Sequence, residues 1–331
     1  MKQSLLFWFS IAVVICLIVW YHHIIQLKYN SVSLYTPESI KSSDPQVEGI
    51  LNQKVVFGAE IAKTKKVIIT GLLRDTEDNI PFIIKKVEAV GKLFDDYAVL
   101  IVENNSKDKT RELLLAWAKK NSKVVILGCG VNNTECSIDF AKTKTEGHGV
   151  SYDRINKMVK LRNISLDYIK HHPQLRLYDY TIMWDLDIIG TAYLDGILIS
   201  IYELDKNADI SGICATGVRR YAGGLFSIYY DTYAHIDEGD NFHIDRKMAH
   251  DIEKGFKHAQ HPRGSELIKV KSCFSGFTIY RTSSLLPPHV RYTMTPPGDD
   301  NIECEHARLA KVLPGEMSLN PNSINMVLLN T

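Results

Sequence analysis

The feature that most constrains the fold of this chain is an alternation of short apolar segments with longer amphipathic ones. The apolar segments are rich in Val, Ile and Leu, as buried strands require, and lie at 66–73, 97–102, 124–127, 180–184 and 210–217. Stretches with helical apolar spacing lie at 80–94, 113–118, 154–169 and 193–204. Strands that alternate with helices form βα units. The pattern therefore predicts an α/β domain with a parallel sheet that helices cover on both faces.

The first 64 residues precede this pattern. Residues 5–21 are apolar apart from Ser10 and reach the lower limit for a membrane-spanning helix. A cleaved signal peptide is the alternative, but it requires a shorter apolar core and a small-residue cleavage site. We predict a cytoplasmic tail at 1–4, a signal anchor at 5–21, a Ser- and Pro-rich stem at 22–64 with a short helix near Val47–Leu51, and a catalytic body at 65–331. The simplest topology is single-pass type II, with the body in the Golgi or ER lumen if the cell is eukaryotic.

Charge and cysteine content narrow the class of protein. The net charge of +1 gives no electrostatic reason to expect nucleic acid as a partner. One of the six cysteines, Cys16, lies in the predicted anchor. Cys129 and Cys136 are close enough to bridge a loop, and Cys273 could meet Cys304, but five remaining cysteines is an odd number and the pairing stays open. No Cys-x-x-Cys occurs, so a zinc site is not expected.

Two carboxylates, Asp185 and Asp187, directly follow the apolar segment 180–184. Side chains at i and i+2 of an extended segment point the same way, so both aspartates could face one cation. Mg²⁺ and Mn²⁺ prefer such oxygen ligands and are commonly shared with substrate phosphates. The alternative is a strand that simply ends in a polar turn.

Polar residues also follow the other predicted strands, at the edge where sheets of this type bind ligands. Glu103 could accept hydrogen bonds from a base or a ribose, and Arg74 could contact a diphosphate. For both, an exposed loop residue is the alternative. Arg162 and Asn163 lie near the apolar stripe of 154–169, from which Arg162 could reach the same cleft and neutralise phosphates.

An acidic cluster at 298–305 precedes a predicted helix near the carboxyl end. Acidic residues are favoured at the positive end of any helix, which is the alternative to a functional role. A neutral His306 would be a competent third metal ligand. Glu305 or Glu303 could act as a base or orient an acceptor.

The segment 219–261 is rich in Tyr, His, Asp and Gly, a composition that predicts poor core material. Aromatic faces beside carboxylates suit sugars, so we interpret it either as an acceptor-facing lobe or as a mobile surface loop. The next segment, Val270–Tyr280, predicts a strand pair or a kinked strand, with Gly276 allowing close approach of a ligand.

Several short motifs together connect the chain to a known fold. These are Gly71-Leu72-Leu73-Arg74-Asp75, Asn79-Ile80-Pro81, Glu103-Asn104-Asn105-Ser106-x-Asp108-x-Thr110, Leu161-Arg162-Asn163, Trp184-Asp185-Leu186-Asp187 and Cys304-Glu305-His306. Through them the chain resembles nucleotide-sugar glycosyltransferases of the GT-A fold over 65–313. Within that fold it is most similar to the fungal capsule-associated α-mannosyltransferase family, with the mannan-polymerase-type mannosyltransferases as cousins.

The resemblance implies a Rossmann-like mixed sheet and a nucleotide-sugar donor such as GDP-mannose, bound through Mn²⁺ or Mg²⁺ and transferred to a glycan or glycoconjugate. The implied donor-binding residues are Leu72, Arg74, Glu103, Asn105, Arg162, Asn163 and Asp185. The implied metal ligands are Asp185, Asp187 and His306, and the implied catalytic residues are Glu305 and Arg162. The family favours retention of configuration; an inverting enzyme would need a base such as Glu305.

Three Asn-x-Ser/Thr sequons begin at Asn104, Asn132 and Asn163. Asn104 and Asn163 fall where the donor is expected, so we predict that only Asn132 could carry a glycan. Two other functions remain compatible with the sequence. One is a metal-dependent phosphohydrolase or nucleotidyltransferase that uses the same pair of aspartates, and the other is a non-catalytic, membrane-tethered sugar-binding protein.

Overall fold

The computed structural model describes residues 35–128, 151–221, 226–240, 261–296 and 302–328, together with positions 8, 11, 13–17 and 20. Within these residues, no helix combines the length and the apolar character needed to cross a membrane. Most of the predicted anchor at 5–21 lies outside them, as do Cys129, Cys136 and Asn132.

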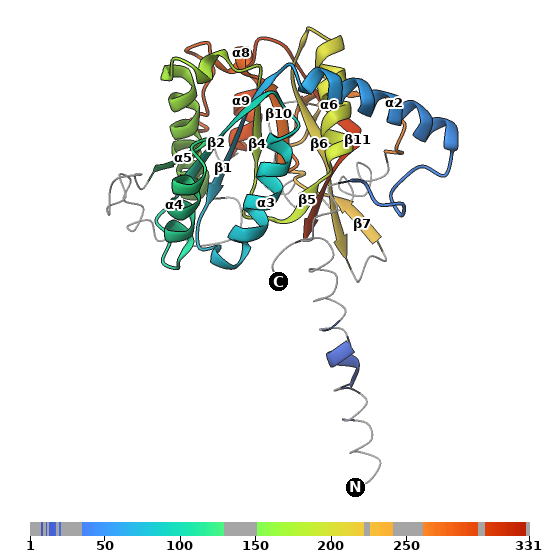
Figure 1. The fold of residues 1–331 in the computed structure, drawn as a ribbon, viewed down its shortest axis with the longest axis horizontal. Helices are drawn as coiled ribbons and strands as arrows, with labels where there is room; N and C mark the ends of the chain where they lie inside the picture. Colours follow the sequence, from blue (N-terminus) through green and yellow to red (C-terminus); the bar gives the residue numbers. More distant parts are fainter. Residues whose placement is uncertain are drawn as a thin grey trace.

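A mixed sheet forms the centre of the protein (Figure 1). Its strands are β1 (Lys66–Leu73), β2 (Asp96–Glu103), β3 (Val124–Gly128), β4 (Tyr180–Trp184), β5 (Ile189–Ala192), β6 (Ile210–Tyr221), β7 (Phe226–Tyr229), β8 (Ile236–Asp237), β9 (Ile268–Ser272), β10 (Phe277–Arg281) and β11 (Glu316–Leu328). Among the described residues the strand order is β3-β2-β1-β4-β10-β6-β11-β9-β8, with β5 paired to β11 and β7 to β6. The predicted α/β architecture with a mixed sheet is confirmed.

The parallel half of the sheet brings the ends of three strands to one edge. β1 pairs in parallel with β2 from Lys66↔Asp96 to Leu73↔Glu103, and β4 pairs in parallel with the other side of β1. β10 runs antiparallel between β4 and β6. Because parallel strands end on the same side, the residues that follow β1, β2 and β4 meet there.

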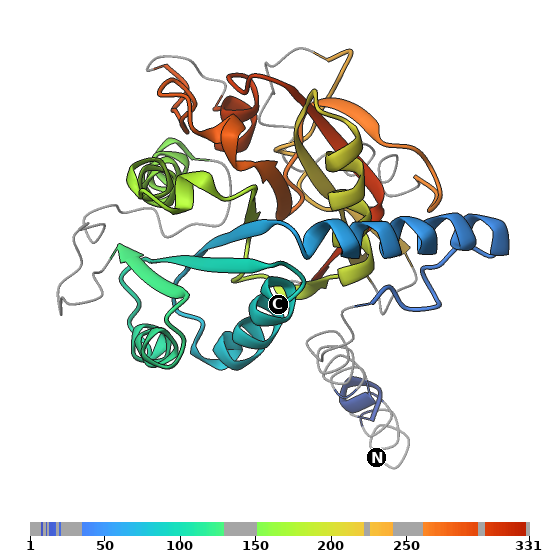
Figure 2. The ribbon, with the colours of Figure 1, turned by 45° about the horizontal axis from the view of Figure 1, so that its top comes forward.

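Helices cover both faces of this sheet (Figure 2). They are α2 (Pro45–Ala62), α3 (Ile80–Gly91), α4 (Thr110–Lys120), α5 (Tyr152–His171), α6 (Leu194–Lys206), α8 (Thr282–Leu285) and α9 (Glu305–Ala310). Successive strand residues point to opposite faces, so Val67 and Ile69 share a core cluster with α3, α4 and α6, whereas Ile68 lies with the end of α5. The site described below lies on the α5 side.

The second half of the predicted stem is a long helix, not an irregular spacer with one short turn. Asp44 caps α2 by accepting a hydrogen bond from the Gln46 N–H at 2.8 Å, and Pro45 occupies its first turn. The helix packs on α6 so closely that a Cβ on Gly58 would lie 2.0 Å from the Leu198 carbonyl oxygen. Residues from Pro45 to Ala62 are therefore part of the folded domain (Figure 1).

The long strand β11 lies inside the sheet, between β6 and β9, and the sequence did not predict it. It pairs with β6 over most of its length, with a register shift between Asn320 and Ile324. The interruption Asn320-Pro321-Asn322-Ser323 has the composition of a turn, yet it forms an irregularity inside one continuous strand.

Part of the segment 219–261 is core, which the prediction of poor core material missed. Tyr229, His235 and Ile236 are each 1% exposed, because β7 and β8 pair with β6 and β9. The remainder, at 222–225 and 241–260, lies outside the described residues.

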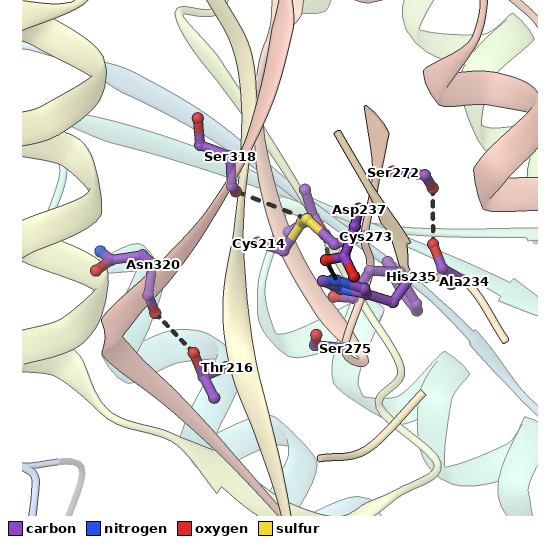
Figure 3. Close-up of a disulfide and its surroundings, with 12 residues drawn as sticks. Cys214, Thr216, Ala234, His235, Asp237, Ser272, Cys273, Ser275, Ser318 and Asn320 are labelled. Carbon is purple, nitrogen blue, oxygen red and sulfur yellow. Dashed lines mark hydrogen bonds and ion pairs between the residues drawn. A yellow bond between two sulfur atoms is a disulfide. The ribbon is translucent and has the colours of Figure 1, made fainter. Parts of the chain in front are cut away.

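Cys273 forms a disulfide with Cys214, and not with Cys304 as the sequence suggested (Figure 3). Cys214 lies on β6 and Cys273 just beyond β9, and their Cα atoms are 6.1 Å apart. Cys304 is a buried free thiol at the start of α9. The bond joins segments separated by 59 residues and fixes the backbone immediately before the turn at 274–276.

Candidate active site

Asp185 and Asp187 lie in the turn that connects β4 to β5. The Asp185 N–H donates to the Gly276 carbonyl at 2.9 Å, and the Ile188 N–H donates to the Asp185 carbonyl at 3.3 Å. Trp184 and Leu186 are buried in the core on the α3 side. The two aspartates, by contrast, are half-buried and exposed; they lie in a turn and not in the extended segment that the prediction assumed, so their common orientation stays a prediction.

Arg162 of α5 joins two predicted site residues. Its Nη2 donates to Asp185 Oδ1 and its Nε donates to Glu305 Oε1, both at 3.0 Å. The guanidinium group is buried and lies over the Phe274 ring, 5.0 Å from the centroid. Burial alone would lower the pKa of Arg162, but the carboxylates of Asp185 and Glu305 raise it well above its usual value. The arginine is a permanent cation at the centre of the site.

His306 lies next to this ion-pair network, at the start of α9. It is 2% exposed, its ring stacks on Phe274 with centroids 3.5 Å apart, and its Nε2 lies 3.8 Å from Glu305 Oε1. Burial, and then the charge of Arg162, lower the pKa of His306 well below its usual value, so the ring is neutral. Neither ring nitrogen has a hydrogen-bond partner among the described residues. A buried neutral imidazole without a partner has a lone pair to offer a ligand.

The site carries an excess of negative charge that a cation would relieve. Burial raises the pKa of Asp185, despite its bond to Arg162. Desolvation, and then the charge of Asp185, raise the pKa of Asp187 to about 7. Carboxylate oxygens beside a neutral imidazole suit Mn²⁺ or Mg²⁺. In the part of the chain that the structure describes, however, no three such side chains are already gathered as a metal cluster.

A fourth carboxylate, Asp231, belongs to this site and was missed by the sequence analysis. It follows β7 with φ of +74°, a left-handed conformation that is uncommon outside glycine. Its neighbour Tyr229 hydrogen-bonds Ser275, which directly precedes the carbonyl that anchors Asp185. Burial, and then the charges of Asp185 and Glu305, raise the pKa of Asp231 to about 7. No motif surrounds Asp231, so its neighbours in the chain did not predict a role in the site.

The loops after β1 and β2 are tied to each other at the predicted donor end. The Asp75 N–H donates to Ser106 Oγ at 3.1 Å, and the Lys107 N–H donates to Asp75 Oδ1 at 2.6 Å. Further along, the Thr76 N–H donates to Thr110 Oγ1 at 2.7 Å. The two loops thus form one rigid wall.

Four predicted donor residues lie in or beside this wall. Arg74 is half-buried, and its Nε contacts Asp75 Oδ2 at 3.1 Å. Leu72 and Asn105 are also half-buried, and Asn105 adopts φ of +54°. The fourth, Glu103, is the last residue of β2 and directly precedes one of the two loops.

The structure does not support direct contact between Glu103 and a nucleoside. The residue is 1% exposed; its Oε1 accepts from the Ser106 N–H at 2.7 Å and its Oε2 from Arg111 Nε at 3.0 Å. Both oxygens already have partners inside the protein. Glu103 therefore shapes the loop that would meet a nucleoside, since its carboxylate is buried and bonded to Ser106 and Arg111.

Asn163 is also engaged inside the protein. Its amide nitrogen donates to the Tyr292 carbonyl at 2.9 Å, and its amide oxygen accepts from the Tyr292 N–H at 3.1 Å. The Tyr292 ring packs edge-on against His306, with centroids 5.5 Å apart. Asn163 thus supports the residues behind His306, and its contact with the donor stays a prediction.

The domain thus combines a mixed α/β sheet with charged residues that gather just beyond β4. A family model described as cryptococcal mannosyltransferase 1 matches residues 66–310. The chain belongs to this family and is a glycosyltransferase, as its motifs suggested.

Two solved structures illustrate how distant other similarities are. A mannosyltransferase from Pyrobaculum calidifontis, PcManGT, solved with GDP-Man and Mn²⁺, is 9% identical with a TM-score of 0.43, covering 86% of this chain and 68% of that one. S. aureus TarS 1–349, solved with UDP-GlcNAc, is 13% identical with a TM-score of 0.43. The match covers 80% of this chain and 60% of the TarS chain. No curated protein sequence matches the chain.

Proposed function

We propose that this enzyme transfers a sugar, mannose from GDP-mannose, to a glycan or glycoconjugate acceptor and depends on Mn²⁺ or Mg²⁺. Membership of the mannosyltransferase family supports the sugar. The observation that carries the proposal is the buried group formed by Arg162, Asp185 and Glu305 beside the unpartnered ring of His306. This group combines a fixed cation, carboxylate ligands and a neutral imidazole at one end of the sheet.

Asp185 and Asp187 would hold the divalent ion, with His306 as a third ligand. When bound, such an ion supplies positive charge that stabilises the departing diphosphate. Arg162 adds a second, permanent cation at the same place, already oriented by its two carboxylate partners. Because the guanidinium is fixed before substrate arrives, little reorganisation is needed during the reaction.

The acceptor hydroxyl has two candidate carboxylate partners. Glu305 accepts a hydrogen bond from Arg162 Nε, so its carboxylate is already engaged in placing the guanidinium group. Asp231 has no ion-pair partner among the described residues, and burial raises its pKa, which strengthens it as a proton acceptor. We assign the orientation of the acceptor hydroxyl to Asp231 and the placement of Arg162 to Glu305.

We further propose that the body works in an oxidising compartment, anchored as a type II membrane protein in the Golgi or ER. The Cys214–Cys273 bond supports this, because disulfides persist mainly outside the cytosol. The apolar segment at 5–21 supports the anchor.

The test uses the purified full-length chain with a panel of nucleotide sugars, an acceptor glycan and either Mn²⁺ or EDTA, and measures nucleoside diphosphate release. Release from GDP-mannose with Mn²⁺ is expected, with a loss of at least about 100-fold in Asp187→Asn. Glu60→Gln, an exposed carboxylate of α2, is the control and should retain full activity. Phosphate release without glycosidic transfer would instead indicate a phosphohydrolase. Binding of no sugar nucleotide would refute the proposal.

A further inference from the structure

Lys86 is a buried charged residue that the proposed reaction does not use directly. It lies on α3 with 5% of its surface exposed, and its Nζ donates to the Gly190 carbonyl at 2.6 Å. The same Nζ lies 5.9 Å from the centre of the Trp184 ring. Among the described residues, no carboxylate pairs with it. Burial lowers the pKa of Lys86 to about 8, so at neutral pH the protein holds an ammonium group with one carbonyl acceptor.

The acceptor of this hydrogen bond lies at the end of the turn that carries the two aspartates. Gly190 pairs with Val327 of β11, and its backbone is so close to that strand that a Cβ would lie 1.8 Å from the Met326 carbonyl oxygen. The start of the turn is held by the bond from the Asp185 N–H to the Gly276 carbonyl. Lys86 thus reaches the far end of the turn from the opposite face of the sheet.

We propose that Lys86 is a positioning residue that holds the turn 185–190 in the conformation in which Asp185 and Asp187 face the cation. This inference rests on the proposed metal-dependent function. An aliphatic side chain would fill the same core space without burying a charge. A charged donor, by contrast, makes a stronger bond to the Gly190 carbonyl than a neutral one. Compared with an aliphatic side chain, Lys86 would therefore strengthen metal binding but leave the stability of the metal-free protein unchanged or lower it.

The opposite effects on stability and binding give a sharp test. Full-length wild type, Lys86→Met and Lys85→Met are compared; Lys85 is the exposed neighbour on the same helix and serves as the control. Three quantities are measured: the melting temperature without metal, the affinity for Mn²⁺ in the presence of GDP by calorimetry, and amide hydrogen exchange of residues 185–192. Only the second requires bound metal, and none requires turnover.

Lys86→Met should melt at the same temperature as wild type or higher, bind Mn²⁺ at least tenfold more weakly, and exchange faster at 185–192. Lys85→Met should match wild type in all three. Unchanged Mn²⁺ affinity in Lys86→Met would overturn the inference. So would a large fall in melting temperature or a failure to fold, since Lys86 would then be a stabilising core residue. If wild type itself binds neither Mn²⁺ nor GDP, the proposed function fails first, and this inference fails with it.

Discussion

Replacing Arg162 with Met tests whether one buried cation organises the site. The guanidinium bridges Asp185 and Glu305, whose side chains are 19% and 6% exposed. Met fills similar space but leaves two carboxylates close together without a counter-charge. The variant therefore isolates the electrostatic contribution of Arg162 from its packing.

Both stability and catalysis should suffer. Removing one partner from a buried ion pair costs about 3–5 kcal/mol, because the remaining charge is left uncompensated. For a domain of this size, that corresponds to a fall of about 6–20 °C in melting temperature. Transfer should slow by about 10²–10³-fold, the usual effect of removing a fixed group that stabilises developing charge.

Cation binding gives the prediction a second, independent readout. Mn²⁺ would neutralise part of the charge that Arg162→Met exposes, so the metal should raise the melting temperature of the variant more than that of wild type. Thermal denaturation with and without Mn²⁺, together with initial rates of nucleoside diphosphate release, measures these effects. Lys160→Met on the exposed face of α5 is the control, and it should change stability by less than about 0.5 kcal/mol. If Arg162→Met melted and turned over like this control, the bridging role assigned to Arg162 would be wrong.

Three further predictions concern single groups. Asp231→Asn should slow transfer at least about tenfold and leave GDP binding unchanged. Initial rates measure the first quantity and calorimetry the second. A variant that transfers sugar as fast as wild type would exclude Asp231 as the partner of the acceptor hydroxyl. Cys214→Ser should lose about 2–4 kcal/mol of unfolding free energy in denaturant titrations. Reductant should lower the unfolding free energy of wild type but leave that of Cys214→Ser unchanged. A wild type whose unfolding free energy does not respond to reductant would contradict this. The pKa of Lys86 falls from 10.5 in the unfolded chain to about 8 when folded, so the unfolded state binds more protons between these values. The stability of wild type should therefore rise by about 3 kcal/mol relative to Lys86→Met from pH 8 to pH 10.5, and a constant difference across this range would refute the buried charge.

The sequence predicted the strands and helices that a local pattern defines. β1 and β4 are predominantly apolar and buried, and both lie where the pattern placed them. β11 was missed because its irregularity at residues 320–323 looks like a turn, and only pairing with β6 makes that segment part of a strand. Local composition cannot reveal a partner that lies about a hundred residues away.

The same limit applies to the site. Asp185 and Asp187 could be singled out from the sequence because they directly follow a buried strand, β4. Asp231 and Lys86 could not be singled out, because each acquires its role from distant parts of the chain: Asp231 from the charges of Asp185 and Glu305, and Lys86 from a carbonyl 104 positions further along the chain.

The motif residues also divide into two kinds that the sequence alone could not separate. Arg162 and His306 present groups to the site, since one contacts Asp185 directly and the other has unused ring nitrogens. Glu103 and Asn163 belong to equally recognisable motifs, but their polar atoms bond the backbones of Ser106 and Tyr292. Both kinds of residue are needed for the same geometry: substituting Arg162 removes a charge from the site, whereas substituting Glu103 displaces the loop that would contact a nucleoside. A loss of activity therefore identifies a ligand-contacting residue only when stability and loop position are shown to be unchanged.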